Sequence, residues 1–426
     1  MTDADKKLRD SQMILGLEEE VAPATLPDEG LDLRVAPRKE PQTPGEWIKD
    51  NLFSGPVNSI ITIALTLFIL WFGSKVLHYV FASADWTILK VNFRSYMTGR
   101  WPLEELWRVW LGTYAIALLA GLSRGISVIP FVFSRRRLVV LGLVAAAALL
   151  VELYVVTTLF THALVAGLIL TIVLGIYLGR RFRDVIPRRA VLIAWIAAYP
   201  ALILLLRVGG PNERLWSGFM VNLIVATLAI FASFPIGVLL ALGRRSTMPA
   251  IRYFCVGVIE IIRGAPLYTL LIFGVFVLPL MLPPQISKPP NIVLAVIMIT
   301  AFSAVYVAEI VRGGLQGIPE GQYEAARALG LPYRKMIRLV ILPQALRATI
   351  PAMISHFISL FKDTSLLATI AILELLRQAR RASAALGFAG RSMEALLPAA
   401  LLFWIVAFSM ARWSQRLEKR LGVGER

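Results

Sequence analysis

The residues of this chain that could do chemistry are charged side chains that interrupt long apolar stretches. Glu309 and Arg312 stand three positions apart, and Glu260 and Arg263 have the same spacing. Because residues three apart are neighbours on the surface of a helix, each couple is expected to form a local ion pair. Charged groups inside a membrane are costly and commonly mark transport paths. Arg263 and Glu309 are therefore candidates for lining a path through the membrane.

A second polar group, Lys362-Asp363-Thr364-Ser365, interrupts another apolar stretch. Lys362 and Asp363 are consecutive, so they point in different directions on a helix and need separate partners. In one interpretation the four residues line the route or its gate and contact a zwitterionic substrate. In the other they form a structural polar network between subunits, and both interpretations remain open on the sequence.

Two smaller features concern packing. Glu152 lies within an apolar tract, where a buried hydrogen bond is its expected role. Gly313 and Gly317 form a small-xxx-small pair, which permits two helices to approach closely. We expect this close approach within the chain itself, with a contact between subunits as the alternative.

The residues needed for catalysis or cofactor binding do not assemble into a recognisable set. The motif G-x-x-x-x-G-K-[ST] is absent, and Gly243-Arg244-Arg245-Ser246 does not replace it, so the chain is not expected to hold ATP. The single cysteine, Cys255, and the three histidines lie far apart and predict neither a disulfide nor a metal site. His356 has no second group to complete a catalytic site and is expected to pack or to form a hydrogen bond. The chain is therefore predicted not to be an enzyme and to bind no metal or cofactor.

Composition indicates which elements hold these residues. Of the 426 residues, 57% are hydrophobic and 17% are charged, whereas soluble domains average about 45–50% and about 25%. Both differences point to a membrane protein. The net charge of +17 would suggest nucleic acid as a partner only if it lay on a soluble face.

The chain divides into a polar tail and a series of apolar stretches. Residues 1–50 are acidic, proline-rich and predicted to be a disordered cytoplasmic tail without a signal peptide. The apolar stretches are Val57–Ser74, Val109–Leu122, Leu138–Leu178, Val191–Leu206, Phe219–Leu242, Ile259–Leu282, Ile292–Ile310, Ile350–Leu376 and Ala395–Ala411. The third is too long for one crossing and should break at residues 157–162, which gives about ten transmembrane helices. A turn is expected at residues 208–216.

The basic residues record an orientation. With alternating spans and a cytoplasmic N-terminus, most Lys and Arg residues fall on the inner side, so both termini are expected in the cytoplasm. The bilayer, not nucleic acid, is then the expected surroundings. Residues 377–391 are the exception, because their four arginines would lie outside. Either this segment is partly re-entrant or it contacts an acidic partner.

One inner connection, residues 312–347, is far longer than the others. A short helix is expected at Gln322–Leu329, followed by Gly330 at the position of a helix-terminating glycine. A second amphipathic helix is expected at Tyr333–Val340 and should stop at Pro343. The first helix has small alanines and the charged Glu324 and Arg327, which suit a docking element. The alternative is an interfacial helix that only caps the bundle.

Four motifs resemble those of one family. Glu324-Ala325-Ala326 with Gly330 and Ile341-Leu342-Pro343 resembles the EAA loop of ABC-importer membrane subunits. Segments 262–267 (IRGAPL), 308–314 (AEIVRGG) and 357–366 (FISLFKDTSL) resemble motifs of the polar amino-acid permease branch, although alanine in RGAPL replaces the usual Thr or Val. This resemblance covers residues 216–413. Segments 58–68 and 99–108 are similar to the longer, M-type permeases of general L-amino acid uptake systems.

The resemblance implies an all-α integral membrane protein of the bacterial inner membrane. Residues 51–210 would add N-terminal transmembrane helices to a five-helix type I importer core at 216–413, followed by a basic cytoplasmic tail at 414–426. The residues implied to couple to the ATPase are Gln322, Tyr323, Glu324, Ala325, Ala326, Arg327, Gly330 and Pro343. The candidates for the translocation path are Arg263, Gly264, Pro266, Glu309, Lys362, Asp363, Thr364 and Ser365.

By the same resemblance, the chain would be a permease subunit that translocates L-amino acids into the cytoplasm. Its implied partners are a second homologous permease, two cytoplasmic ATPase subunits that bind ATP and Mg²⁺, and a periplasmic amino-acid-binding protein. An amino-acid transporter driven by an ion gradient is the alternative. It predicts inverted repeats and intramembrane carboxylates at broken helices; we find no such repeat, and the long inner loop would be unexplained.

Overall fold

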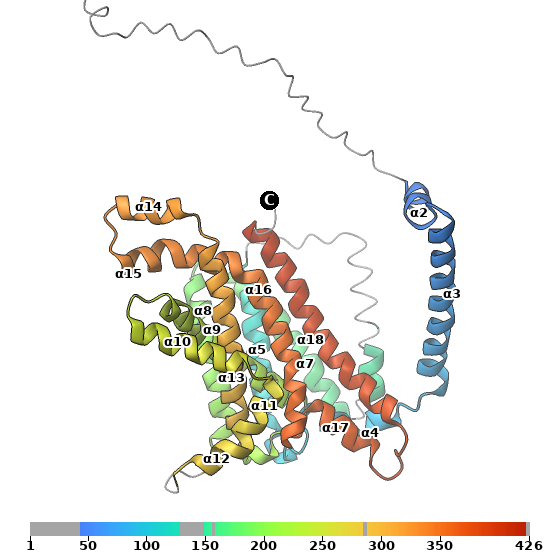
Figure 1. Ribbon diagram of the computed structural model, residues 1–426. Helices are drawn as coiled ribbons and strands as arrows, with labels where there is room; N and C mark the ends of the chain where they lie inside the picture. The colour runs from blue at the N-terminus through green and yellow to red at the C-terminus, as the bar shows by residue number, and fades with distance from the viewer. Residues whose placement is uncertain (1–42, 128–145, 147–148, 156–157, 284–287, 423–426) are drawn as a thin grey trace, which may run out of the picture. The chain divides into compact units, whose positions relative to one another are not determined.

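Helices make up the whole of the regular structure in the computed structural model, which describes residues 43–127, 146, 149–155, 158–283 and 288–422 (Figure 1). No β-strand occurs in these ranges. A single isolated parallel bridge joins Gly218 to Glu374. The chain forms two compact units, residues 1–83 and 84–426. The predicted disorder of residues 1–42 and the last four residues of the basic tail lie outside the described ranges.

The first unit contains α2 (Pro44–Leu52) and α3 (Pro56–His78), followed by a π-helical turn at Tyr79–Ser83. The helix α2 begins within the predicted tail because Thr43 and Glu46 form a reciprocal capping box. The predicted stretch Val57–Ser74 lies within α3, and no residue of α3 is buried by the rest of the chain. With 23 residues, α3 is long enough to cross a bilayer.

The second unit begins with α4 (Thr87–Thr98), a 3₁₀ turn at Leu103–Glu105, α5 (Leu106–Ile126), α7 (Leu159–Arg181) and α8 (Arg188–Arg207). Glycines set the distance between α5 and α7. A Cβ atom on Gly121 would lie 2.5 Å from the carbonyl oxygen of Ile172, and one on Gly125 would lie 2.4 Å from that of Ile176. Their G-x-x-x-G spacing, repeated at Gly175 and Gly179, lets the two backbones touch.

The remaining helices follow in chain order. They are α9 (Phe219–Arg244), α10 (Pro249–Arg263), α11 (Leu267–Ile272), α12 (Leu278–Met281), α13 (Asn291–Gln316), α14 (Glu320–Ala328), α15 (Tyr333–Met336), α16 (Leu342–Asp363), α17 (Leu375–Ser383) and α18 (Ser392–Leu421). The helices α9 and α13 pack along each other through the centre. One apolar cluster surrounds Val221 and Ile299, and another joins Val311 and Ala241 to α14 and α15.

The described residues contain eight helices that are long and apolar enough to cross a membrane, or nine if α10 to α12 form one broken span. This agrees with the predicted all-α membrane architecture of about ten spans. Most of the first half of the stretch 138–178 is outside the described ranges. Its second half is α7, and Thr158 caps that helix where the break was predicted. The 3₁₀ turn at Glu213–Leu215 lies within the predicted turn at 208–216.

Two predicted spans have different boundaries in the structure. The stretch 259–282 is not a single straight helix, because the chain bends by 102° between α10 and α11. Pro266 follows the bend, and proline disfavours a helical conformation in the residue before it. The stretch 350–376 ends its α-helix at Asp363 and continues as a 3₁₀ segment to Ile370.

Pro343 does not stop the second helix of the inner loop, contrary to the prediction. The helix runs from Tyr333 through a π-helical turn at Ile337–Ile341 into α16. In that turn the N–H of Leu342 donates to the carbonyl oxygen of Ile337. The wider turn adds one residue and relieves the clash that a proline ring makes with the preceding turn of an α-helix.

Candidate functional site

The short helix α14 lies at one end of the bundle, where the inner loop was predicted (Figure 1). It covers Glu320–Ala328, close to the predicted Gln322–Leu329. Gly330 ends it with a φ of 70°. The N–H of Gly330 donates to the carbonyl oxygen of Arg327 at 2.8 Å, and that of Leu331 donates to Ala326 at 3.2 Å. These two bonds form a Schellman motif, which confirms the predicted position of Gly330.

The two faces of α14 differ in exposure. Tyr323 and Ala326 are buried against α13 and α15. The side chains on the exposed face are Gln322, Glu324, Ala325, Arg327 and Ala328. Ala326 therefore belongs to the buried face of α14. The sequence analysis had grouped it with the small alanines that would meet a docking partner. Leu329, which the sequence analysis did not single out, is 79% exposed beside this face.

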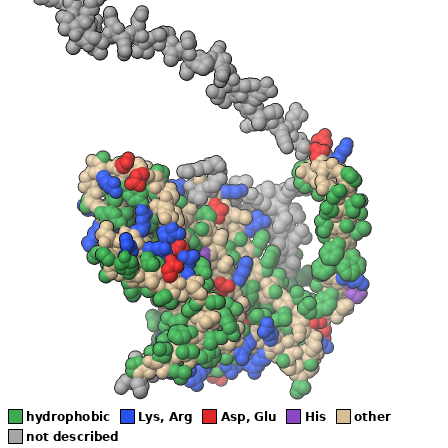
Figure 2. All heavy atoms as spheres, in the orientation of Figure 1, with side chains coloured by type: hydrophobic (Ala, Val, Ile, Leu, Met, Phe, Trp, Pro, Cys, Tyr) green, Lys and Arg blue, Asp and Glu red, His purple; other side chains and the backbone are tan. Residues whose placement is uncertain are grey.

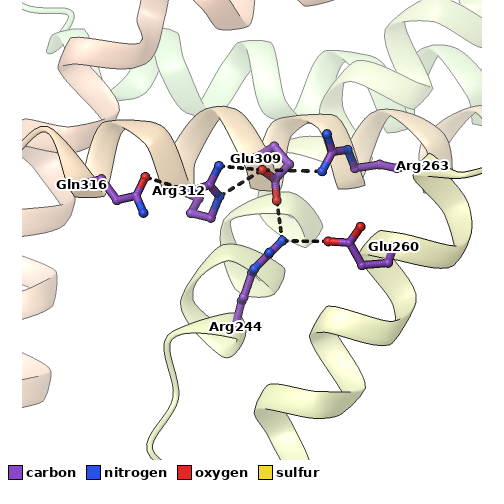
Figure 3. A network of polar contacts seen from close by, with 6 residues as sticks. All are labelled: Arg244, Glu260, Arg263, Glu309, Arg312 and Gln316. Atoms are coloured by element: carbon purple, nitrogen blue, oxygen red, sulfur yellow. Dashed lines mark hydrogen bonds and ion pairs between the residues drawn. The ribbon is translucent and has the colours of Figure 1, made fainter.

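A network of charged side chains lies at the same end and centres on Glu309 of α13 (Figure 3). Its carboxylate oxygens lie 2.6 Å from Nη1 of Arg244, 2.9 Å from Nη2 of Arg312 and 3.6 Å from Nη1 of Arg263. The predicted pairing of Glu309 with Arg312 is confirmed. The predicted pairing of Glu260 with Arg263 is wrong. Oε1 of Glu260 instead lies 3.3 Å from Nη1 of Arg244.

This network joins three helices that are distant in sequence. Arg244 ends α9, Arg263 ends α10 with Glu260 one turn before it, and Glu309 lies near the C-terminal end of α13. The side chain of Glu309 is only 16% exposed. Three guanidinium groups against two carboxylates leave the cluster with one excess positive charge. Loss of Glu309 would leave Arg263 and Arg312 without a carboxylate in the cluster and Arg244 with Glu260 alone, which makes Glu309 the residue on which the cluster depends.

Arg245 connects this end of α9 to α14. Its Nη1 donates to the hydroxyl of Tyr323 at 3.3 Å and to the carbonyl oxygen of Leu315 at 3.5 Å. The Tyr323 hydroxyl itself donates to the Leu315 carbonyl at 3.4 Å. Two consecutive residues, the last of α9 and the one that follows it, thus contact the charged network through Arg244 and α14 through Arg245. Sequence reasoning missed both arginines, and the only signal was a basic pair at the end of an apolar stretch.

The second candidate group, residues 362–365, lies at the other end of α16. Lys362 is exposed and Asp363 is half-buried, whereas Thr364 is fully buried. The Thr364 hydroxyl accepts from Nδ2 of Asn222 at 3.1 Å, and the same Nδ2 donates to Glu374 at 3.2 Å. The structure therefore brings Thr364 into a polar network within the chain and leaves Lys362 and Asp363 outside it.

Glu374, which the sequence analysis did not single out, is fully buried and caps α17. Its carboxylate accepts from the backbone N–H groups of Leu376 at 2.8 Å and Arg377 at 2.7 Å. Burial raises the pKa of the Glu374 carboxyl, although these bonds favour its ionised form. This residue fixes the start of a helix that the sequence analysis did not predict.

The other candidates have structural surroundings of different kinds. Gly264 and Pro266 lie exposed at the bend between α10 and α11. His356 lies 3.0 Å from the Ser303 hydroxyl, which donates to Ser233 at 2.9 Å, so the expected hydrogen bond of His356 is confirmed. Within the described ranges, no group of three or more His, Cys, Asp and Glu residues could hold a metal.

The two packing predictions have opposite outcomes. Glu152 forms the expected hydrogen bond, since its Oε1 lies 2.5 Å from Nδ1 of His162. Gly313 has no atom within 4 Å of its Cβ position, so the predicted close approach within the chain is wrong there. Gly314 is the packed glycine instead: a Cβ would lie 2.8 Å from the carbonyl oxygen of Ala345.

Comparison with known proteins gives one matching family and full-length relatives. The model of the family "Binding-protein-dependent transport system inner membrane component" matches residues 233–423. The amino-acid ABC transporter permease protein YhdY of Escherichia coli K12 is 34% identical, over 89% of this chain and 93% of its own length. The glutamate/glutamine/aspartate/asparagine transport system permease protein BztC of Rhodobacter capsulatus is 32% identical, over 91% and 96%.

Shorter relatives match only the C-terminal half. The probable glutamine ABC transporter permease protein GlnP of Bacillus subtilis is 36% identical, over 48% of this chain and 93% of its own length. A crystal structure of an amino acid ABC transporter with histidines is similar at a TM-score of 0.43 and 28% identity, over 48% of this chain and 92% of that one. The helices that precede the C-terminal half thus lie in the part of the chain that also matches YhdY and BztC.

Proposed function

Because this chain belongs to the amino-acid ABC transporter permeases, the inner membrane components of binding-protein-dependent transport systems, we propose that it carries L-amino acids into the cytoplasm as one subunit of an ATP-driven importer. It is a multi-pass membrane protein. In the proposed complex it pairs with a second homologous permease. Two cytoplasmic ATPase subunits hold ATP and Mg²⁺, and a periplasmic protein supplies the amino acid. Both termini lie in the cytoplasm.

The observation that carries this proposal is the position of α14. The helix protrudes at one end of the bundle with an exposed face that contains Gln322, Glu324, Ala325 and Arg327. Its buried face rests on the inner ends of the transmembrane helices. Gly330 turns the chain sharply after it, and Pro343 lies just beyond the π-helical turn that leads into α16. An ATPase groove that receives the exposed face would move the bundle through this packed joint.

In this proposal, the charged network holds α9, α10 and α13 together at that joint. A displacement of α14 pulls on Tyr323, which Arg245 joins to the end of α9. Arg244, the preceding residue, transmits the displacement to Glu309 on α13 and Glu260 on α10. Breaking these contacts lets the inner ends of α9, α10 and α13 separate. Such switching between two packed arrangements is a recognised mode of transmission.

The candidate residues of the translocation path then form two groups. Arg263, Gly264, Pro266 and Glu309 lie at or near the bend that follows α10 and control the inner exit. Residues 362–365 lie at the opposite end of α16, near the entrance. Since Thr364 is fully buried, it positions the entrance through Asn222 and Glu374. The exposed Lys362 and half-buried Asp363 are the members able to contact a zwitterionic solute.

Reconstitution in liposomes tests the proposal. The chain is combined with the partner permease, the ATPase subunits and the binding protein, and uptake of radiolabelled amino acids is measured. We expect uptake only when ATP and the binding protein are both present. Uptake driven by a proton or sodium gradient without ATP would contradict the proposal and favour a secondary transporter.

A further inference from the structure

A cavity lies where the connection between α7 and α8 meets the end of α5. It has a volume of about 380 Å³, and its walls are formed by Ile126, the last residue of α5, and by residues 183–187 of the connection. The helices α5 and α7 are in backbone contact beside it, since a Cβ atom on Gly179 would lie 2.5 Å from the carbonyl oxygen of Leu122. The cavity therefore lies at a tightly packed junction of helix ends.

This junction lies at the end of the second unit that carries α14. The indole N–H of Trp195 donates to the Ser123 hydroxyl, close to the end of α5. Arg108, at the start of α5, donates to the carbonyl oxygen of Leu205 near the end of α8, so the two helices run antiparallel. The helix α9 follows α8 after a short turn and runs back to Arg244. Figure 2 shows hydrophobic side chains over the middle of the second unit and Lys and Arg side chains towards its two ends, as a bilayer requires.

Arginines outnumber acidic residues around the cavity. Arg181 ends α7, Arg183 lines the cavity, and Arg189 lies in the first turn of α8. All three are exposed, and no ion pair in the described part of the chain includes any of them. Asp184 is the single acidic residue of the sequence from 159 to 207. The junction therefore keeps an excess of positive charge that an anion can neutralise.

The helix α7 carries an exposed apolar stripe that leads to these arginines. Its members stand at positions i, i+3, i+4 and i+7 and are each at least half exposed: Leu170, Val173, Leu174 and Tyr177. Arg181 follows Tyr177 by four positions and therefore lies on the same face. Beyond the helix, Phe182 is 45% exposed and Val185 is 75% exposed. An apolar face that ends in cations matches the acyl chains and the phosphate of a phospholipid.

The polarity of the helix end explains only part of this arrangement. The carbonyl groups at the C-terminus of α7 favour neighbouring cations, which accounts for Arg181. Arg183 lies beyond the C-cap residue Phe182 and lines the cavity together with the exposed Val185. A preference for arginine on the inner side sets the sign of the charge but does not build a cavity. Basic pockets at the ends of transmembrane helices are typical sites for anionic headgroups.

The backbone of the connection is held in place by hydrogen bonds. The N–H groups of Val185 and Ile186 both donate to the carbonyl oxygen of Phe182, at 3.1 and 2.9 Å. The N–H of Ala190 donates to the carbonyl oxygen of Pro187 at 2.9 Å. A site held in this way loses little conformational entropy when a ligand binds.

We propose that this junction binds the headgroup of an anionic phospholipid from the leaflet on the α14 side. Arg181 and Arg183 bind the phosphate through charge-assisted hydrogen bonds. The acyl chains lie along the stripe of α7, and the bound lipid ties the end of α7 to the start of α8. A free phosphate ion would leave the stripe and Val185 without a contact, so the apolar side chains favour a lipid. The inference goes beyond the proposed function, because it concerns a bound lipid and not the transported solute.

Native mass spectrometry of the purified full-length chain in detergent tests the inference. The chain is titrated with phosphatidylglycerol, and with zwitterionic phosphatidylcholine for comparison. We expect the wild type to retain phosphatidylglycerol preferentially. Arg181→Gln with Arg183→Gln should weaken its affinity for phosphatidylglycerol about thirtyfold, since each basic residue near anionic lipid contributes about 1 kcal/mol and about 1.4 kcal/mol is a tenfold change. The matched control, Arg380→Gln with Arg381→Gln, removes the same charge from exposed side chains at the opposite end and should stay within about twofold of wild type.

A second variant leaves the arginines in place. Val185→Asp puts a carboxylate at the wall of the cavity, on a side chain whose exposure tolerates the change. We expect about fivefold weaker binding of phosphatidylglycerol, because an adverse charge near the phosphate costs about 1 kcal/mol. Binding of phosphatidylcholine should not change. The melting temperature without added lipid shows whether each variant is folded, and Val185→Asp decides the question if the arginine variant is not.

Three outcomes overturn the inference. One is unchanged affinity for phosphatidylglycerol in the folded variants of the junction. Another is an equal loss in the Arg380→Gln, Arg381→Gln control, which would show that only the total charge matters. The third is displacement of phosphatidylglycerol by millimolar inorganic phosphate, which would assign the cavity to a free phosphate ion.

Discussion

The two ends of this bundle are both rich in arginine but use it differently. At the end that carries α14, Arg244, Arg263 and Arg312 converge on Glu309 within the chain. At the opposite end, Arg380 and Arg381 line a cavity and form no ion pair among the described residues, and Arg380 acts on the buried carboxylate of Glu374 only at longer range. The first arrangement ties helices together, whereas the second leaves guanidinium groups exposed at the surface. The position of the nearest carboxylate, not the residue type, decides which role an arginine has.

The difference also sets the size of the expected effects. Glu309 is mostly buried, so its charge interactions are weakly screened and its loss is felt throughout the network. The cations of the opposite end are largely exposed, so each contributes little to stability. Substitutions at the end that carries α14 should therefore alter folding and transport more than those at the opposite end.

The largest effect is expected for Glu309→Ala, which removes the carboxylate that Arg244, Arg263 and Arg312 share. We expect it to destabilise the protein by about 1–3 kcal/mol and to reduce uptake at least tenfold. Thermal unfolding of the purified chain and uptake by the reconstituted complex measure the two effects. The control is Glu104→Ala, an exposed glutamate at the opposite end. An unchanged melting temperature with normal uptake would remove the network from the account.

The second prediction concerns the exposed face of α14. Glu324→Lys reverses a charge that is directed at the proposed ATPase groove, and we expect about tenfold less uptake with normal stability of the isolated chain. ATP-dependent uptake and melting temperature are measured on the same preparations. Unchanged ATP-dependent transport would count against α14 as the joint to the ATPase.

A smaller effect is expected for Tyr323→Phe, which removes the hydroxyl that accepts from Arg245 and donates to the carbonyl oxygen of Leu315. Both hydrogen bonds are long, and losing a hydrogen bond costs about 1 kcal/mol, so we expect about threefold fewer amino acids imported per ATP hydrolysed. A role limited to packing would leave that ratio unchanged. Arg252→Gln, near the same end of the bundle, is the control for a general effect of substitution.

The smallest effect is expected for Asp85→Asn, which breaks the pair with Arg391 at the end opposite α14. Both side chains are more than a third exposed, and such pairs contribute about 0–1 kcal/mol. We expect a change in melting temperature near the limit of detection and normal uptake. A loss comparable to that of Glu309→Ala would show that the two ends are not different in kind.

Local chemistry explains which features the sequence predicted. The pairing of Glu309 with Arg312 follows from a spacing of three residues, and Gly330 follows from the need for a left-handed residue after a helix. The spans follow from the length of their apolar runs. In each of these cases the deciding residues are neighbours in the chain.

Features that depend on distant residues were not predictable in this way. Arg244 reaches Glu309 across 65 positions, and Arg245 reaches Tyr323 across 78. Pro343 was misjudged because a π-helical turn removes the clash that normally ends a helix. Glu374 was missed because its role as a cap depends on the unpredicted start of α17. Tertiary packing decides each of these features, and a single sequence does not show which distant residues pack together.

One measurement tests most directly whether the two ends have separate roles. The maximal rate of ATP-driven uptake by the reconstituted complex is recorded for wild type, for Glu309→Ala and for the Arg380→Glu, Arg381→Glu variant. We predict that Glu309→Ala lowers the maximal rate at least tenfold, because it removes the carboxylate that three arginines share. The second variant should leave the maximal rate unchanged, because its side chains are exposed and form no ion pair among the described residues. If both variants lowered the maximal rate to the same extent, the difference between the two ends would be wrong.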